Sequence, residues 1–296
     1  MRYKSLEDRI VDIVAIIIVT FVAICCVYPV IYCVSMSLSS DDAIVKHSVT
    51  LLPVGFSFES YKIVLEDSKF VTSLVNSVYQ TVLGTVLSLF FNLTLGYVLS
   101  RRNFIFKPQL TVFILIPMFF GGGLIPSYLL IRSLGLYNTI WAIVLPGAVS
   151  IWNAILAKTF FMSTIPDDVI ESSIMDGAND FTIFLRIVLP LSTTIIAILA
   201  LYAAVGRWND YFSALIYLKD ETLQPLQLYL RNILSAQASS SSMSDMMDTT
   251  DYISNYVNSQ RIKYVLIVVS TLPIIIVYPF IQKFFVKGVM LGSVKG

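Results

Sequence analysis

One polar segment carries the residues with the most informative types and spacing. It runs from Thr164 to Pro190 and reads TIPDDVIESSIMDGANDFTIFLRIVLP. Thr164 and Asp167 match a helix capping box and Pro166 suits a first turn, so we predict a helix that begins near Ile165. The positive end of the helix dipole favours carboxylates in the first turns, and three occur there: Asp167, Asp168 and Glu171. We therefore predict a helix whose first turns carry a concentrated negative charge, which suits polar contacts and not catalysis.

The same predicted helix has an apolar stripe in an otherwise polar stretch. The stripe residues recur at helical spacing: Ile170, Ile174 and either Val169 or Met175. Gly177 can adopt the left-handed backbone that ends a helix, and Asn179 can cap a second helix. We therefore predict a short helix, a sharp turn and another helix. The stripe needs a partner, which is either another protein or the membrane surface.

Residues for covalent or metal chemistry are few. The chain has a single histidine, His47, and its three cysteines are Cys25, Cys26 and Cys33. These build neither a zinc site nor a disulfide framework. Ser150 and Lys158 are eight positions apart, about 12 Å along a helix, which is too far for direct proton transfer. Because no nucleophile with a base and no metal site is found, we expect no enzyme. A formal net charge of +1 provides no basic face, so we also expect no nucleic-acid partner.

The elements that must position these residues are membrane spans. Apolar residues make up 56% of the chain and charged residues 13%, which is typical of a membrane protein. Six apolar blocks contain no Asp, Glu, Lys or Arg: Val14–Leu38, Leu74–Leu99, Leu110–Ile131, Ile140–Ala157, Ile187–Gly206 and Tyr264–Gln282. We therefore predict an all-α polytopic membrane protein with six transmembrane helices, of which the first is an uncleaved span.

The positive charges predict the orientation of these spans. Arg101, Arg102 and Lys107 crowd one short loop, whereas the short loop on the opposite side has only Arg132. Both termini, residues 1–13 and 287–296, are therefore expected in the cytoplasm, and residues 14–286 form the six-helix domain. The informative polar segment, as a loop over residues 163–186 between spans four and five, shares the cytoplasmic side.

Breaks and loops are also predicted. Seven prolines are expected to bend or break the spans: Pro29, Pro117, Pro126, Pro146, Pro190, Pro273 and Pro279. The glycine-rich run Phe120–Pro126 predicts a break in span three, as a hinge or as simple flexibility. Two long outer loops, Ser39–Ser73 and Arg207–Lys263, flank the spans. The second holds a solvated polar tract: Ser239–Ser242, Asp245, Asp248 and Asp251.

The polar segment resembles the "EAA" signature of permease subunits of binding-protein-dependent ABC importers. The matching residues are Glu171, Ser172, Ser173, Asp176, Gly177, Ala178, Ile187, Leu189 and Pro190. Ser172 and Ser173 stand where the signature has two alanines, and Thr194 stands where a second proline is usual. Phe119–Pro146 and the run Trp208-Asn209-Asp210-Tyr211 are similar to the carbohydrate-importer branch of that family, of the oligosaccharide or maltose-importer type.

The resemblance implies a coupling role. The helix over Ile165–Gly177 is similar to the coupling helix that docks on a separate cytoplasmic ATPase, where Glu171 makes polar contacts and Gly177 permits close approach. The chain has no phosphate-binding Gly-x4-Gly-Lys-Ser/Thr loop, so ATP and Mg²⁺ belong to that ATPase and no cofactor is expected here. The implied partners are a second homologous permease, two ATPase subunits, an extracellular solute-binding protein, a sugar and the lipid bilayer of a bacterial cell membrane.

Substrate contacts are less specific in the sequence. Four amides within the spans are candidates for a polar path: Asn76, Gln80, Asn92 and Asn153. Hydrogen bonds between packed helices are the alternative for each of them. Trp208, Asn209 and Asp210 lie near a span end and are candidates for an outer gate or an interfacial aromatic belt.

A facilitative or secondary transporter that works without an ATPase is the competing function. Ion-coupled carriers usually place an acidic residue or histidine within a span, and the six blocks contain none. Ion coupling is therefore disfavoured, whereas a facilitative pore stays open.

Overall fold

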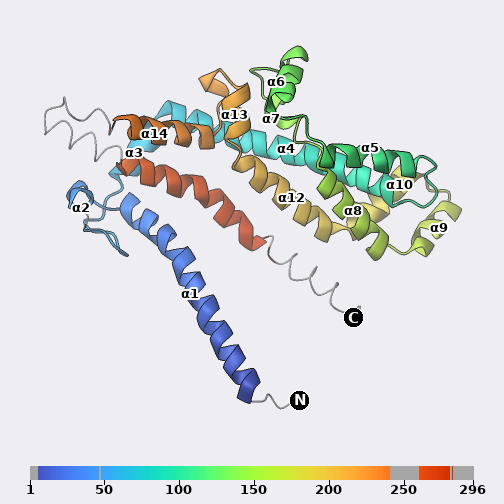
Figure 1. Ribbon diagram of the computed structural model, residues 1–296, viewed down its shortest axis with the longest axis horizontal. Coiled ribbons are helices and arrows are strands. Elements are labelled where there is room, and N and C mark those ends of the chain that lie inside the picture. The colour runs from blue at the N-terminus through green and yellow to red at the C-terminus, as the bar shows by residue number, and fades with distance from the viewer. Residues whose placement is uncertain (1–5, 47, 241–259, 281, 283–296) are drawn as a thin grey trace. The chain divides into compact units, whose positions relative to one another are not determined.

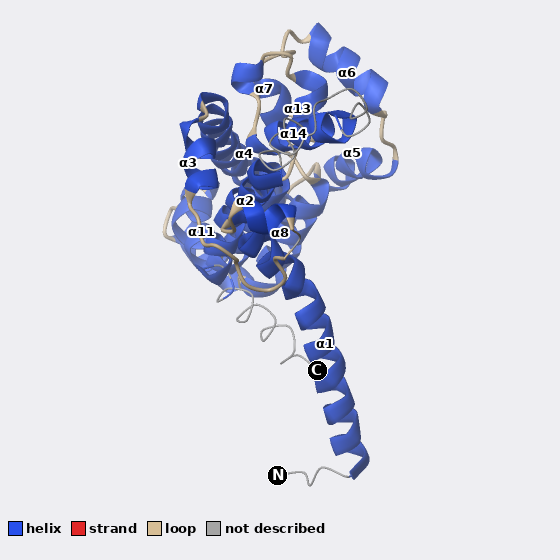
Figure 2. Cartoon of the chain, turned by 90° about the vertical axis from the view of Figure 1, so that its left-hand side faces the viewer, coloured by secondary structure: helices blue, strands red, loops and turns tan. Residues whose placement is uncertain are grey.

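The computed structural model of the protein describes residues 6–46, 48–240, 260–280 and 282 (Figure 1). All regular structure in these residues is helical, and they contain no strand (Figure 2). The elements in chain order are α1 (Leu6–Ser37), α2 (Asp41–Val45), α3 (Glu59–Glu66), α4 (Ser68–Ser100), α5 (Lys107–Phe119), α6 (Leu124–Ser133), α7 (Trp141–Val144), α8 (Ile151–Thr164), α9 (Asp167–Met175), α10 (Asp180–Ile183), the π-helix η1 (Phe184–Val188), α11 (Leu189–Leu191), α12 (Thr193–Trp208), α13 (Phe212–Tyr217), the 3₁₀-helix η2 (Glu221–Leu223) and α14 (Leu226–Ser240). A further helix spans Gln260–Phe280.

Three of these helices are long and apolar enough to cross a membrane: Arg9–Ser37 within α1, α4, and Gln260–Phe280. Two bent pairs also qualify when each is counted as one span. α5 and α6 meet at 117°, and Asp180–Leu191 meets α12 at 84°. The described residues thus hold three candidate spans, or up to five with the bent pairs.

The fourth predicted span, Ile140–Ala157, is not one long helix. α7 ends at Val144 and α8 begins at Ile151. Pro146 has no backbone N–H and Gly147 has a high conformational entropy, so the intervening residues leave the helix. The expectation that Pro146 bends or breaks this block is therefore confirmed.

The breaks in spans three and five are confirmed. Between α5 and α6 the chain leaves the helix over 120–123, and Gly123 has a φ of +83°, which favours glycine. In span five a π-helix precedes Pro190, and the bend follows at Ser192. Pro29, by contrast, lies inside α1 without ending it.

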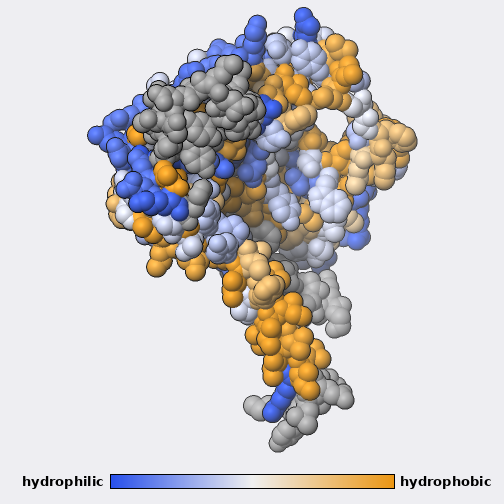
Figure 3. Space-filling view, turned by 60° about the vertical axis from the view of Figure 1, so that its left-hand side comes forward, coloured by the Kyte–Doolittle hydropathy of each residue, from blue (hydrophilic) through white to orange (hydrophobic). Residues whose placement is uncertain are grey.

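The chain divides into two units, and the first comprises residues 1–70 and 230–272. In this unit α1 presents a continuous apolar surface (Figure 3), and its most apolar window is not buried at all. The polar region that follows α1 forms α2 and α3, and a small apolar cluster of Met36, Ala43, Ile44 and Val49 joins the end of α1 to α2. Tyr32 and Tyr264 meet edge to face at 5.9 Å beside this cluster.

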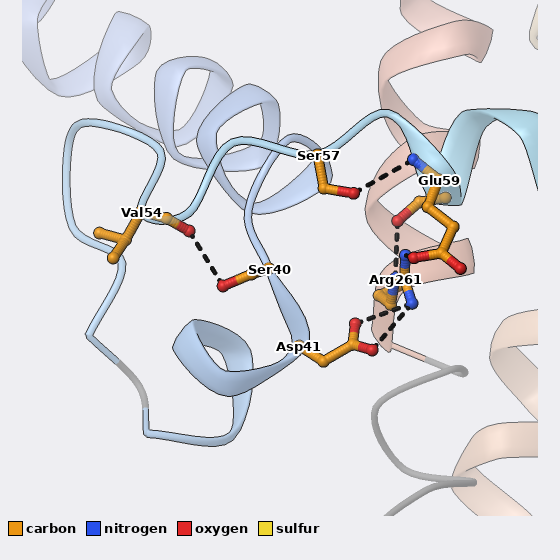
Figure 4. Close-up of polar contacts among 7 residues, drawn as sticks. Ser40, Asp41, Val54, Ser57, Glu59 and Arg261 are labelled. Carbon is orange, nitrogen blue, oxygen red and sulfur yellow. Dashed lines mark hydrogen bonds and ion pairs between the residues drawn. The ribbon is translucent and has the colours of Figure 1, made fainter.

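Arg261 fastens three elements of this first unit together (Figure 4). Its side chain is only 5% exposed. The guanidinium forms an ion pair of 2.8 Å with Asp41 of α2 and one of 3.3 Å with Glu59 of α3. Its Nε also donates to Ser60 Oγ at 2.7 Å. Every side of this cation is thus matched by an acceptor, which makes its burial tolerable.

The second unit comprises residues 71–229 and 273–296, and α4 is its central helix. One face of α4 is buried and polar, with residues at helical spacing: Ser73, Ser77, Gln80, Ser88 and Asn92. The opposite face is exposed and apolar: Val75, Val78, Val82, Val86 and Phe90. This reversal of the usual pattern suits a helix whose outer face meets lipid and whose inner face meets protein.

Small residues let α4 and α8 approach each other closely. A Cβ added at Gly96 would lie 2.6 Å from Ala157 Cβ and 3.0 Å from the Ala154 carbonyl oxygen, and both alanines are fully buried. Such contacts between small residues are a common means of packing membrane helices. Beside them lies the largest apolar cluster of the unit, which includes Phe161 and Leu199.

Two sequence expectations concern residues at the edges of the described ranges. α14 continues through Ser239 and Ser240, so these two serines of the predicted solvated tract are helical. Ser241, Ser242 and the three aspartates of the tract lie outside the described residues, as does His47.

Candidate functional site

The helix of the polar loop exists, but it begins later than predicted. α9 starts at Asp167 with Pro166 as its N-cap, and no side chain caps it. Thr164 is the last residue of α8, so the predicted capping box and the start near Ile165 are wrong. Ile165 is extended, because the residue before a proline is disfavoured in the α region. Asp167 and Asp168 do occupy the first turn, as expected.

The turn after α9 follows the prediction closely. Gly177 has a φ of +83° and its N–H donates to the Ile174 carbonyl at 2.9 Å. The Ala178 N–H donates to the Ser173 carbonyl at 3.0 Å, which completes a Schellman motif. Asn179 Oδ1 then accepts from the Thr182 N–H at 2.8 Å and caps α10. Two short helices are thus joined by a turn with little conformational freedom.

The apolar stripe of α9 is divided between the interior and the surface. Ile170 is 4% exposed and belongs to the main apolar cluster, together with Ile165 and Ile183. Ile174 is 50% exposed and Met175 is 86% exposed. One part of the stripe therefore anchors α9 to its own chain, and the other part is left uncovered.

The first six residues of the signature, Glu171, Ser172, Ser173, Asp176, Gly177 and Ala178, divide in the same way. Two of them face the protein: Ser173 is 9% exposed and donates to the Val169 carbonyl at 2.6 Å, and Ala178 packs against the apolar cluster. The other four are exposed: Glu171, Ser172, Asp176 and Gly177. The exposed surface therefore offers a partner the carboxylates of Glu171 and Asp176, the Ser172 hydroxyl and the Gly177 backbone.

Residues at the end of α4 hold this loop in place. Arg102 forms an ion pair of 2.9 Å with Asp167 at the start of α9. The Tyr97 ring lies 4.9 Å from the Phe184 ring, centroid to centroid, and the Tyr97 hydroxyl donates to the Asp180 carbonyl at 3.4 Å. An open hollow of about 420 Å³ lies here, lined by Arg101, Glu171 and Ile174 among others. The sequence used Arg101 and Arg102 only for orientation, and it gave no sign of Tyr97.

Three of the four candidate path amides hold the fold. Asn76 Nδ2 donates to the Thr222 carbonyl at 2.7 Å, and Gln80 Nε2 donates to the Leu223 carbonyl at 3.0 Å. Asn92 donates to the Ala148 carbonyl at 3.1 Å and accepts from the Ser150 N–H at 2.8 Å. These contacts agree with the alternative of hydrogen bonds between packed segments.

The loop that Asn76 and Gln80 bind is itself fixed by side chains. Asn138, with a φ of +59°, accepts through Oδ1 from the N–H groups of Lys219 and Asp220, both at 2.8 Å. The Asp220 carboxylate accepts from the Thr222 N–H at 2.9 Å and from its hydroxyl at 2.8 Å. These two bonds hold the pKa of the Asp220 carboxyl below its usual value.

Asn153 and Asp210 differ from the other candidates because both line a cavity. It measures about 280 Å³, and other polar members of its lining are Ser88, Ser150, Tyr202 and Arg207. The Asn153 side chain makes no hydrogen bond to another described residue. Trp208 is 6% exposed, which argues against a role in an interfacial belt, and Asn209 is exposed and donates to the Val205 carbonyl at 2.9 Å.

Arg207 is the residue that sequence reasoning placed in the wrong surroundings. It follows Gly206 at the end of an apolar block and was therefore predicted in an outer loop. Its side chain instead lies against Gly84, near the middle of α4, where an added Cβ would overlap its Cδ, Nε and Cζ atoms. Arginines within membrane-spanning segments are rare, and those that occur usually have a function.

The described residues contain no group of three His, Cys, Asp or Glu side chains that could hold a metal ion.

A family model described as "Binding-protein-dependent transport system inner membrane component" matches residues 80–291. The chain belongs to this family. As a membrane component of a binding-protein-dependent ABC system, it works with an ATPase in a separate subunit and with a binding protein.

Individual relatives of this permease cover almost its whole length. It is 39% identical, over 98% of this chain and 100% of the relative, to the "Polygalacturonan/rhamnogalacturonan transport system permease protein YtcP" of Bacillus subtilis. It is 28% identical, over 93% of this chain and 94% of the relative, to the "Arabinooligosaccharides transport system permease protein AraQ" of Halalkalibacterium halodurans. A solved structure, "Crystal structure of a bacterial ABC transporter involved in the import of the acidic polysaccharide alginate", matches with a TM-score of 0.85 at 35% identity, covering 96% of this chain and 100% of that chain.

These comparisons confirm the resemblance stated from the signature. The chain is a multi-pass inner membrane permease, and ATP hydrolysis belongs to another polypeptide. The roles of Glu171 and of the other signature residues stay predictions.

Proposed function

We propose that the chain forms half of the translocation pore of an ATP-driven importer for oligosaccharides or polysaccharide fragments, with a second homologous permease as the other half. The relatives reported above are named for saccharide transport, and they match along nearly the full chain. The apolar surface of α1, uncovered within this chain, is available to lipid and to the second permease.

The carrying observation is the uncovered end of α9. Ile174 and Met175 are apolar and exposed beside a Schellman turn that fixes their position. An apolar surface of this kind, with carboxylates at Glu171 and Asp176, suits a cleft of a partner protein better than water. We assign that partner as the ATPase, and each complex as containing two ATPase subunits.

The anchored part of α9 then transmits the movement of the ATPase. Ile170 and Ala178 pack in the cluster that also contains Leu199 of α12. When ATP, bound with Mg²⁺ on the ATPase, draws two such helices together, this cluster moves α12 as well as α9. The bend at Ser192 lies between these two helices, so it is the place where tilting of span five changes access to the pore.

The proposed topology has six crossings with both termini in the cytoplasm. The three long helices and two bent pairs supply five of them, and α7 with α8 supplies the fourth in chain order. The charges of Arg101, Arg102 and Lys107 support a cytoplasmic location for the α4–α5 loop and for α9. A tag inserted beside Asn179 should be reached only from the cytoplasm, and labelling only from outside would contradict this topology.

A substitution on α9 tests the coupling role directly. Ile174→Glu should reduce recovery of the ATPase with the tagged permease, because a charge would enter an apolar contact. Ile63→Glu on α3 is the matched control, since Ile63 is 43% exposed and Ile174 is 50% exposed. The control should leave ATPase recovery unchanged. Equal recovery of the ATPase with both variants would refute the assignment of α9 as the docking helix.

Uptake into proteoliposomes separates the importer from a facilitative carrier. The complete complex, with its binding protein and internal ATP, should accumulate an oligosaccharide, and the permease alone should not pass it. Passage of the saccharide through the permease alone, without ATPase subunits, would favour the alternative of a facilitative or secondary transporter.

A further inference from the structure

Arg207 is held in a fixed position by three contacts from its own unit. Its Nη1 donates to the Ile143 carbonyl at 3.4 Å and its Nη2 donates to the Val144 carbonyl at 3.1 Å. Gly84 of α4 leaves the space that the guanidinium and its last methylene occupy. These contacts place the guanidinium before any ligand arrives, which lowers the cost of ordering it on binding.

The same guanidinium has unused binding capacity. An arginine has five N–H donors, and the two carbonyls accept from two of them. No carboxylate of the described residues lies within ion-pair distance of Arg207. The Asp210 carboxylate lines the same cavity and attracts the guanidinium at longer range, but it accepts from the Ser213 N–H and forms no ion pair with Arg207. An anion that entered the cavity would find three remaining N–H donors on a guanidinium whose positive charge Asp210 offsets only in part.

The cavity has the size and lining of a saccharide site. Its volume of about 280 Å³ is near the lower end of small-molecule sites and far above the roughly 30 Å³ of one water. Its lining includes hydroxyls of Ser88 and Ser150 and the Asn153 amide, which can bond sugar hydroxyls. The Asp210 carboxylate accepts from the Ser213 N–H at 3.0 Å and keeps other lone pairs for a sugar hydroxyl.

We propose that Arg207 binds the carboxylate of an acidic saccharide unit in this cavity and so makes the pore selective for uronic-acid oligosaccharides over neutral ones. The proposal rests on the proposed import of saccharides and names the substrate class. A guanidinium suits this task because its planar fork matches the two oxygens of a carboxylate. Asn153 and Asp210 then bond hydroxyls of the same unit.

The test compares one acidic saccharide with its neutral ester. Trigalacturonate and its fully methyl-esterified form are offered to proteoliposomes that hold the complete importer with ATP inside. The measured quantity is the ratio of the two uptake rates, acid over ester. Any preference of the binding protein is the same in every variant, so it cancels when the ratio of a variant is divided by that of the wild type.

Two variants lower the net positive charge of the cavity in different ways. Arg207→Gln deletes it, and Asn153→Asp adds an opposing charge without changing side-chain size. Each should lower the acid-to-ester ratio about 10- to 100-fold, the range expected for a charge-assisted hydrogen bond. Arg207→Lys should lower it less, because the charge stays while the fork is lost. Arg132→Gln, an exposed arginine of α6 outside the cavity, is the control and should leave the ratio unchanged.

The outcomes separate the two proposals. An unchanged ratio in Arg207→Gln or Asn153→Asp, with uptake still measurable, overturns the carboxylate site and leaves saccharide import standing. If Arg207→Gln fails to assemble, Asn153→Asp decides alone. If the wild-type complex with ATP takes up a neutral oligosaccharide but neither of these two, the carboxylate site fails and saccharide import stands; if it takes up no saccharide at all, both proposals fail.

Discussion

Arg261 is buried and Arg207 is partly buried, and their surroundings differ in kind. Arg261 meets Asp41, Glu59 and Ser60, so its charge is balanced by its own chain. Arg207 donates to two backbone carbonyls and forms no ion pair, and the Asp210 carboxylate attracts it only at longer range across a cavity of about 280 Å³. A paired cation fastens elements of the fold, whereas an unpaired one is available to a ligand. The contrast shows why burial alone does not tell a structural arginine from a functional one.

The largest effect on stability is expected at Arg261. Arg261→Met removes a cation that is 5% exposed and leaves two carboxylates and a serine without their partner. We expect a loss of about 3 kcal/mol, which is seen as a lower thermal midpoint of the purified permease in detergent. Arg261→Lys should lose less, since the charge is kept. A midpoint that did not move in Arg261→Met would mean that this arginine is not a fastening residue.

Gly84→Leu tests Arg207 without removing its charge. The new side chain would occupy the space of the Arg207 guanidinium, so we expect about 1–3 kcal/mol of destabilisation and a lower acid-to-ester uptake ratio. Gly96→Leu, which crowds Ala157 on α8, is the control. It should destabilise the permease to a similar degree with no change in the ratio. Equal acid-to-ester uptake ratios in Gly84→Leu and Gly96→Leu would contradict a selective role of the cavity beside Gly84.

Arg102 provides a third case, that of an exposed pair. Its ion pair with Asp167 joins side chains that are 80% and 51% exposed. Arg102→Gln should cost less than about 1 kcal/mol, because water and salt screen such pairs. The difference in thermal midpoint from wild type should shrink further at high salt. A salt-independent loss as large as that of Arg261→Met would show that exposure does not rank these arginines.

The smallest effect is expected at Asp220, a charge that is exposed and bonded only locally. Its folded pKa lies below the usual value of 3.8, so its contribution to stability is present above that pH and is lost as the pH falls through the folded pKa. The thermal midpoint of Asp220→Ala should therefore lie below that of wild type at neutral pH, and this difference should shrink as the pH is lowered to 3. A difference that grew on acidification would contradict the lowered pKa of Asp220.

Local signals in the sequence predicted the coupling loop well. The left-handed Gly177 and the Asn179 cap follow from residue types whose backbone preferences are strong. The start of α9 could not be found in this way, because Thr164 was used as a cap although α8 continues through it. Short-range rules cannot show where a preceding helix ends.

The Arg207 cavity was not predictable from one sequence, although the apolar blocks were. Excluding charges from the spans is sound on average, but it stopped the fifth block at Gly206, one residue before Arg207. The contacts that hold Arg207 join residues 63 and 64 positions apart, and no periodicity reports them. Asn92 is a second example. Its hydrogen bond to Ala148, 56 positions away, agrees with a packing role and could not be read from local sequence.

The polar inner face of α4 has a consequence for biogenesis. The best window of α4 has a mean hydropathy of 1.8, against 3.1 for α1, because serines and amides line one side of it. Its acceptors are made late: the carbonyl that binds Asn76 lies 146 residues further along the chain. During synthesis, α4 must enter the bilayer before the acceptors of Asn76 and Gln80 exist, so these two amides stay unsatisfied until the second half of the polypeptide is made. Insertion of α4 and completion of its hydrogen bonds are therefore separate events in the maturation of this permease.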